Sequence, residues 1–91
     1  MTPTLKRKFV LNNAEGLHAR PATTLVKIAN EFNARLHLLH GNERVDLKSI
    51  MGVLSLGVPQ GSEVVIEAVG DDADRALIKI IDFLNQLNLK K

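Results

Sequence analysis

Apolar residues in this chain repeat with two different periods, and the order of those periods constrains the fold. Four stretches alternate between apolar and polar side chains, which is typical of strands with one buried face. They are residues 5–11, 34–40, 43–47 and 62–69. Three stretches repeat apolar residues every three or four positions, which indicates amphipathic helices. They are residues 19–31, the segment from Ser49 to Gly57, and the segment from Asp71 or Asp72 to about residue 87.

The predicted order is therefore strand, helix, strand, strand, helix, strand, helix, with turns at Gly41-Asn42 and Gly70-Asp71-Asp72 and a loop at Pro59-Gln60-Gly61. Each predicted strand has one polar face, so we expect an α+β fold in which a four-stranded antiparallel sheet is covered on one side by three helices. The helix over 19–31 is expected to end at Asn33, and Asp71 or Asp72 is expected to cap the last helix. A length of 91 residues suits a single domain over residues 1–91.

Composition excludes several classes of protein. With no cysteine, the chain can form neither disulfides nor a thiolate metal site, and a small chain of this kind fits the reducing cytoplasm. No apolar run reaches the ~20 residues of a membrane span, and no signal peptide is predicted. The basic run from Lys6 to Lys8 has no interleaved aromatics, so no nucleic-acid partner is expected. His37 and His40 would point to opposite faces of a strand, and no metal site is predicted.

The segment from His18 to Pro21 carries the strongest chemical signal. Proline is tolerated in a helix only in the first turn, so Pro21 places the helix start at about Ala19 and His18 at or just before the N-cap. Free N–H groups and the helix dipole favour an anion there, and Arg20 adds a planar cation that matches phosphate oxygens. The anion could be a free ligand or a phosphoryl group on the imidazole. Alternatively, His18 is only a capping residue and Arg20 only a surface cation.

Two segments resemble one known family. Gly16 to Ala22 looks like the phosphohistidine site of HPr, the histidine-containing phosphocarrier of the bacterial phosphoenolpyruvate:sugar phosphotransferase system. Val45 to Val58 is similar to the regulatory-serine segment of the same family. The resemblance covers nearly the whole chain and implies an open-faced β-sandwich of βαββαβα order.

The resemblance also implies a mechanism. Phosphorylated enzyme I would pass a phosphoryl group to Nδ1 of His18, and His18 would pass it to the A domain of a sugar-specific enzyme II. Arg20 and the backbone of Ala19 and Arg20 would hold the phosphate. Such a carrier is not an enzyme, needs no metal or cofactor, and is expected to be a monomer. Glu15 places a carboxylate close to His18 in sequence, which could oppose a phosphate there.

Ser49 begins the second predicted helix, and serine is among the best capping residues. The resemblance implies that an HPr serine kinase/phosphatase modifies Ser49 and that a transcriptional regulator reads the modified protein in carbon catabolite control. It also suggests an exposed surface beside His18 where partners bind, although helical spacing alone would place the apolar residues of this helix in the core. The residues expected on that surface are Ala19, Lys27, Lys48, Ile50, Met51 and Leu54.

Three other functions remain open at this point. The first is the related nitrogen-branch phosphotransferase carrier, which is regulatory and moves no sugar. The second is a pure binding regulator, although relatives of that kind replace the histidine that is intact here as His18. The third is a small enzyme, which the size of the chain disfavours because so short a chain has little room for a deep pocket.

Overall fold

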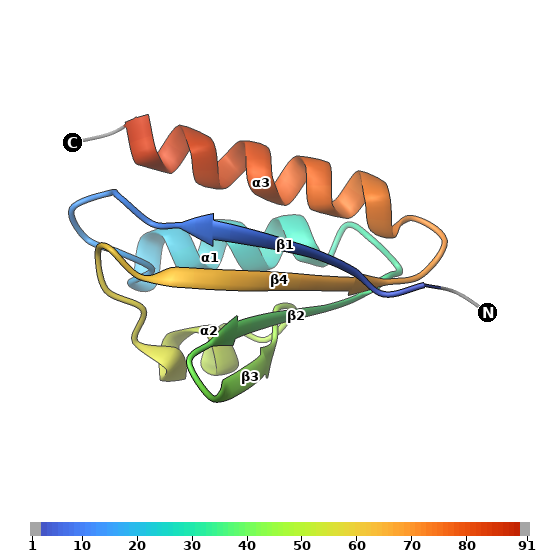
Figure 1. Cartoon of the computed structure of the whole chain (residues 1–91), viewed down its shortest axis with the longest axis horizontal. Coiled ribbons are helices and arrows are strands. Elements are labelled where there is room, and N and C mark those ends of the chain that lie inside the picture. Colours follow the sequence, from blue (N-terminus) through green and yellow to red (C-terminus); the bar gives the residue numbers. More distant parts are fainter. Residues whose placement is uncertain (1–2, 90–91) are drawn as a thin grey trace.

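The computed structural model describes residues 3–89 and contains the predicted elements in the predicted order (Figure 1). The strands are β1 (Leu5–Val10), β2 (Arg35–His40), β3 (Glu43–Asp46) and β4 (Glu63–Val69). The helices are α1 (Ala19–Ala29), α2 (Ile50–Leu56) and α3 (Ala73–Leu89). The predicted βαββαβα order is therefore confirmed.

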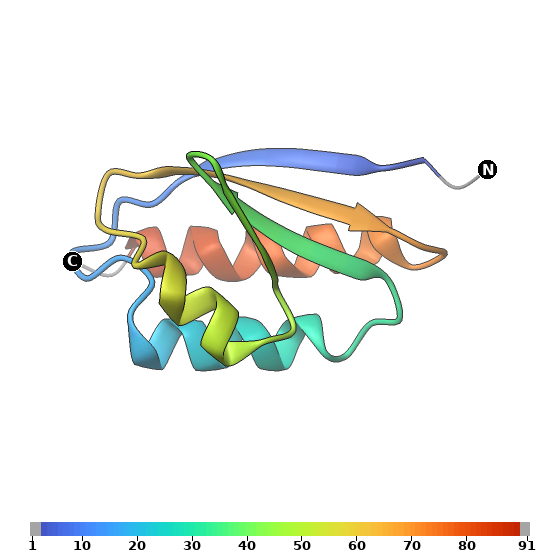
Figure 2. The ribbon, with the colours of Figure 1, turned by 90° about the horizontal axis from the view of Figure 1, so that it is seen from below.

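The four strands form one antiparallel sheet in the order β1-β4-β2-β3. Ile66 in the central strand β4 lies opposite Arg7 of β1 and Leu38 of β2. Side chains alternate along β4, so Val64 and Ile66 are buried under the helices while Glu67 lies on the outer face. Figure 2 shows α1 and α3 side by side below the sheet, and α2 packs against α1 and β3.

The core between the sheet and the helices is aliphatic, as a chain with only three aromatic residues requires. The three phenylalanines are only half-buried and pack at its margin. Every helix contributes to the core, and so do Leu11 and Leu17 in the loop between β1 and α1. The largest side chains that are fully buried are Leu11, Leu25, Leu36, Leu38, Leu47, Val53, Val64, Ile66, Ile80 and Leu84.

Two predicted helix boundaries are wrong. The first helix ends at Ala29 and not near residue 31 or Asn33, because Asn30 forms its C-cap and donates a side-chain hydrogen bond to the Val26 carbonyl at 2.9 Å. The last helix continues to Leu89, two residues beyond the expected end.

Asp72 occupies the N-cap position of α3, as predicted, because its carbonyl accepts the Ala76 N–H at 2.9 Å, but its carboxylate bonds to a different segment. Its carboxylate accepts hydrogen bonds from the backbone N–H groups of Asn33 and Ala34, both at 2.8 Å, so it joins the start of α3 to the start of β2. The Asn33 N–H bond, together with the Ala34 bond and against the effect of burial, holds the pKa of Asp72 below its usual value.

Candidate functional site

The loop between β1 and α1 is held against the segment that follows α2. The Leu17 N–H donates to the Val58 carbonyl at 2.9 Å. Gly16 has a φ of 63°, and a Cβ there would lie 2.2 Å from the Val58 oxygen. The buried Asn13 side chain donates to the Gly16 carbonyl at 2.9 Å, which closes the turn before His18. The position of His18 is therefore set by backbone contacts on both sides of the loop.

His18 occupies the N-cap position of α1 in an extended conformation, as predicted from Pro21. Its side chain makes no capping hydrogen bond and is 45% exposed, which speaks against the simple capping alternative. Its carbonyl accepts the Ala22 N–H at 3.0 Å. Among residues 3–89, the N–H groups of Ala19 and Arg20 have no hydrogen-bond partner, so they remain available to an anion.

The imidazole of His18 has one polar neighbour in the described part of the chain. Its Nε2 contacts the Oε2 atom of Glu15, three residues earlier, while Nδ1 has no partner among residues 3–89. Glu15 was not among the predicted site residues. The available signal was its position just before Gly16, but sequence spacing alone did not show that the two side chains would meet.

His18 and Arg20 line an open depression of about 500 Å³. Its other walls come from the β1–α1 loop, from Pro21 and Thr24 on α1, and from Phe83 and Leu87 on α3. The α3 residues were missed by the sequence analysis because their apolar spacing marks them only as core. The arrangement places an imidazole and a guanidinium on the lining of one solvent-open depression at the start of α1.

The second helix carries the expected exposed apolar residues. Met51 is 76% exposed and Leu54 39% exposed, whereas Ile50 is half-buried. Lys27 is exposed, but the ammonium of Lys48 donates to the Phe32 carbonyl at 2.7 Å and is partly buried. Of the two lysines expected on the partner surface, Lys27 is the exposed one, whereas Lys48 is partly buried.

Ser49 caps α2, as predicted, because its Oγ accepts the Gly52 N–H at 3.1 Å. It does not lie near His18. The Asn30 side chain donates to the Lys48 carbonyl at 3.2 Å, so Ser49 lies beside the C-terminal end of α1. The 11 residues of α1 span roughly 16 Å, and His18 lies at the other end.

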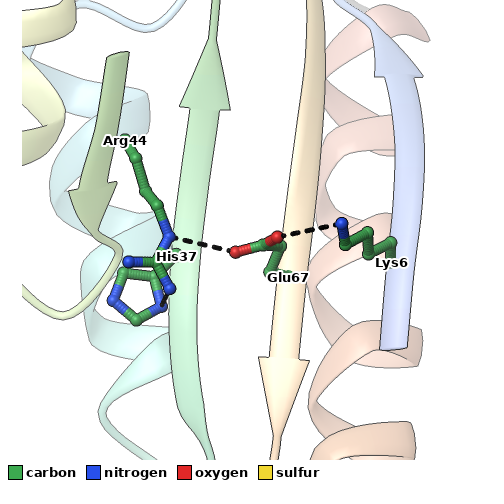
Figure 3. Close-up of polar contacts among 4 residues, drawn as sticks. All are labelled: Lys6, His37, Arg44 and Glu67. Atoms are coloured by element: carbon green, nitrogen blue, oxygen red, sulfur yellow. Dashed lines mark hydrogen bonds and ion pairs between the residues drawn. The ribbon is translucent and has the colours of Figure 1, made fainter. Parts of the chain in front are cut away.

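A separate polar cluster lies on the outer face of the sheet (Figure 3). Glu67 pairs with Arg44 at 3.1 Å and with Lys6 at 3.4 Å, and Arg44 also contacts Nδ1 of His37 at 3.3 Å. Burial raises the pKa of Glu67, but the bonds from Arg44 and Lys6 outweigh it and leave the pKa below its usual value. These cross-strand contacts join β1, β4, β2 and β3 and contribute nothing to the His18 depression.

Among residues 3–89, no group of three or more His, Asp or Glu side chains is arranged to hold a metal ion. No helix in that range has the length and hydropathy needed to cross a bilayer.

Comparison with known proteins identifies the family. The family model described as the PTS HPr component phosphorylation site matches residues 5–86. This chain belongs to the HPr family. HPr proteins are phosphocarriers that bear a phosphorylated histidine and act as members of a relay rather than as enzymes, with enzyme I and enzyme II A domains as their general partners.

Solved HPr structures agree with this assignment. HPr from Thermoanaerobacter tengcongensis is 36% identical, with a TM-score of 0.90 over 96% of this chain and 98% of that chain. HPr from Bacillus anthracis is 34% identical, with a TM-score of 0.84 over 88% and 95%. The Bacillus subtilis catabolite repression protein Crh, seen as an intertwined dimer with a swapped domain, is 37% identical, with a TM-score of 0.73 over 89% and 93%. The HPr-like fold and family predicted from the sequence are confirmed.

Proposed function

We propose that His18 is the residue that carries the phosphoryl group. The observation that supports this assignment most is the half-exposed imidazole at the N-cap of α1, next to backbone N–H groups that have no partner among residues 3–89. A phosphoryl group on the ring would carry about two negative charges, which the N–H groups of Ala19 and Arg20 and the Arg20 guanidinium can stabilise. His37 and His40 lie on β2 and have no such setting.

The transfer needs little from this chain beyond positioning and charge stabilisation. The Nδ1 lone pair of His18 attacks the phosphorus atom held by enzyme I, the new N–P bond forms, and the donor atom keeps the electron pair of the broken bond. In the next transfer, during sugar uptake, a nucleophile on an enzyme II A domain attacks the phosphorus atom, the N–P bond breaks, and Nδ1 keeps its electron pair. An open depression suits two partners that must reach the same phosphorus atom in turn.

Phosphorylation by enzyme I and phosphoenolpyruvate tests the assignment. Wild-type protein should gain acid-labile phosphate, and His18→Ala should gain none. His37→Ala and His40→Ala are matched controls, because each removes one of the two other histidines in the chain and should leave the labelling intact. Labelling that persists in His18→Ala, or is absent from wild type, would overturn the proposal.

The partner surface proposed for this relay consists of Ala19, Lys27, Lys48, Ile50, Met51 and Leu54. The exposure of Met51 and Leu54 supports it, because the two residues lie three positions apart on α2 and therefore place neighbouring apolar side chains on one face of that helix. Methionine suits a surface that must fit several partners, since its side chain repacks at low cost. Such a carrier works as a monomer in the cytoplasm, because it must leave enzyme I before it reaches the next protein.

We also propose that Ser49 is a regulatory phosphorylation site. A phosphate there would lie roughly 16 Å from His18 along α1, well beyond the Debye length of about 8 Å at physiological salt. It would therefore act on partners that cover both ends of α1, such as enzyme I or a transcriptional regulator. Incubation with ATP and an HPr serine kinase should give acid-stable phosphate that is absent from Ser49→Ala.

A role in regulation rather than sugar transport is the second candidate, because Crh, a protein named for catabolite repression, is about as similar in sequence to this chain as the HPr proteins are. The nitrogen-branch carrier would share the His18 chemistry and differ only in its acceptor. Phosphorylated protein should therefore be offered to purified A domains of both branches. Rapid transfer to a sugar-branch A domain supports the transport role, whereas transfer only to a nitrogen-branch domain supports the regulatory one.

A further inference from the structure

We propose that Glu15 is a positioning residue that selects the reactive nitrogen of His18. This inference rests on the proposed function of His18. It starts from the contact between Nε2 of His18 and Oε2 of Glu15. An ionised carboxylate has only acceptor sites, so the nitrogen that faces it must carry the proton. In a neutral imidazole only one nitrogen is protonated, so a proton on Nε2 leaves the lone pair on Nδ1.

The surroundings of Glu15 favour this role. None of the salt bridges within residues 3–89 joins Glu15 to a lysine or an arginine, so its carboxylate is available to the imidazole. The backbone beside it is held by the Asn13–Gly16 hydrogen bonds and by the Leu17–Val58 bond. A carboxylate placed by a fixed turn can orient the ring before any partner arrives.

The same contact remains possible after transfer. When Nδ1 forms its bond to phosphorus, Nε2 keeps its proton and the ring gains positive charge, which the Glu15 carboxylate stabilises. The ring is then held with Nδ1 turned away from Glu15. The negative charge of Glu15 and the incoming phosphoryl group are thereby kept on opposite nitrogens of the imidazole, so the carboxylate need not oppose the phosphate directly.

Ring 15N chemical shifts of His18 test the inference without any phosphate. At a pH where the ring is neutral, wild-type protein should show mainly the Nε2–H form, and Glu15→Ala should show at least a twofold larger share of the Nδ1–H form. Glu31→Gln is the control, because it removes an exposed carboxylate that pairs with Lys79 and lies beyond the far end of α1. It should leave the His18 shifts unchanged.

The rate of phosphorylation by enzyme I gives the second readout. We expect Glu15→Ala to lose at most about fivefold in rate, the upper range for an exposed ion pair, with Glu31→Gln unaffected. Unchanged ring shifts in Glu15→Ala, or a wild-type ring that is mainly Nδ1–H, would overturn the inference. Failure of His18 to accept phosphate would overturn the proposed function instead and leave the tautomer measurement valid.

Discussion

At the scale of single residues, Gly16 determines how closely the loop between β1 and α1 approaches the segment after α2. Its φ of 63° lies in the region that favours glycine, and the space where a Cβ would stand is filled by the Val58 carbonyl. Gly41 provides a comparison, because its φ is 61° and no atom lies within 4 Å of its hypothetical Cβ. Alanine substitutions at the two positions therefore distinguish the cost of backbone strain alone from the cost of strain together with a steric clash.

We predict that Gly41→Ala lowers the free energy of unfolding by about 1–2 kcal/mol, the cost of a left-handed alanine. Gly16→Ala should lower it by roughly 3 kcal/mol or more, because the loop must also move away from Val58. Urea denaturation followed by circular dichroism measures both values. Equal losses would show that the loop moves freely and that the contact does not constrain His18.

At the scale of the elements, the two ends of α1 have different chemistry. The N-terminal end exposes His18 and N–H groups that have no partner in the described part of the chain, whereas the C-terminal end is closed by Asn30, which bonds both Val26 and Lys48. The same Asn30 contact places the start of α2 beside that closed end. The end of α1 that carries His18 and the Ser49 cap of α2 are therefore separated by the length of α1.

Loss of the cap should weaken α2. Ser49→Ala removes the bond from the Gly52 N–H to Oγ, and we expect the free energy of unfolding to fall by about 1 kcal/mol. Ser55→Ala is the matched control, since that hydroxyl donates to a carbonyl within the helix and its removal should change stability by less than about 0.5 kcal/mol. A Ser49→Ala protein as stable as the control would contradict the capping role.

Asp72 should make the protein sensitive to acid. Because the folded state holds the pKa of Asp72 below its unfolded value, the carboxylate stabilises the fold above the unfolded pKa of about 4, and this contribution is lost as pH falls through the folded pKa. Asp72→Asn should lower the urea midpoint at pH 7, since an amide can accept only through one atom. The difference in urea midpoint from wild type should shrink below about pH 4. A difference that stays constant at all pH values would contradict a stabilising role for the ionised Asp72 carboxylate.

At the scale of the whole molecule, one end of the helical layer combines residues from two distant parts of the chain. The β1–α1 loop brings Glu15 and His18, α1 brings Arg20, and α3 brings Phe83 and Leu87. The exposed residues of α2 lie on the neighbouring helix, because α1 and α2 pack together (Figure 2). A partner that covers α1 and α2 could therefore contact both the imidazole and Met51.

This arrangement predicts separate effects on stability and transfer. Met51→Asp should change the free energy of unfolding by no more than about 0.5 kcal/mol, because the side chain is largely exposed, yet it should slow phosphorylation by enzyme I. Ile78→Asp makes the same change at an exposed apolar residue of α3 and should leave the rate unaltered. If both variants slow transfer equally, the surface around Met51 has no special role.

Local sequence features predicted the elements well. Apolar spacing located every strand and helix, with boundaries off by two residues at most except at the end of α1. Pro21 placed the start of α1, and with it His18 and Arg20, because proline restricts its own backbone whatever the tertiary context. Spacing failed at Asn30, where a side-chain bond to Lys48, 18 residues away, helps to end the helix early.

The sequence by itself thus determined the order of the elements, the helix start and the chemistry of its first residues, since these depend on interactions within a few positions of the chain. Only the tertiary structure decided the strand order β1-β4-β2-β3, the position of Phe83 and Leu87 on the same depression as His18, and the distance between Ser49 and His18. Those features depend on which buried faces pack together, and contacts between residues dozens of positions apart leave no periodic trace in the sequence.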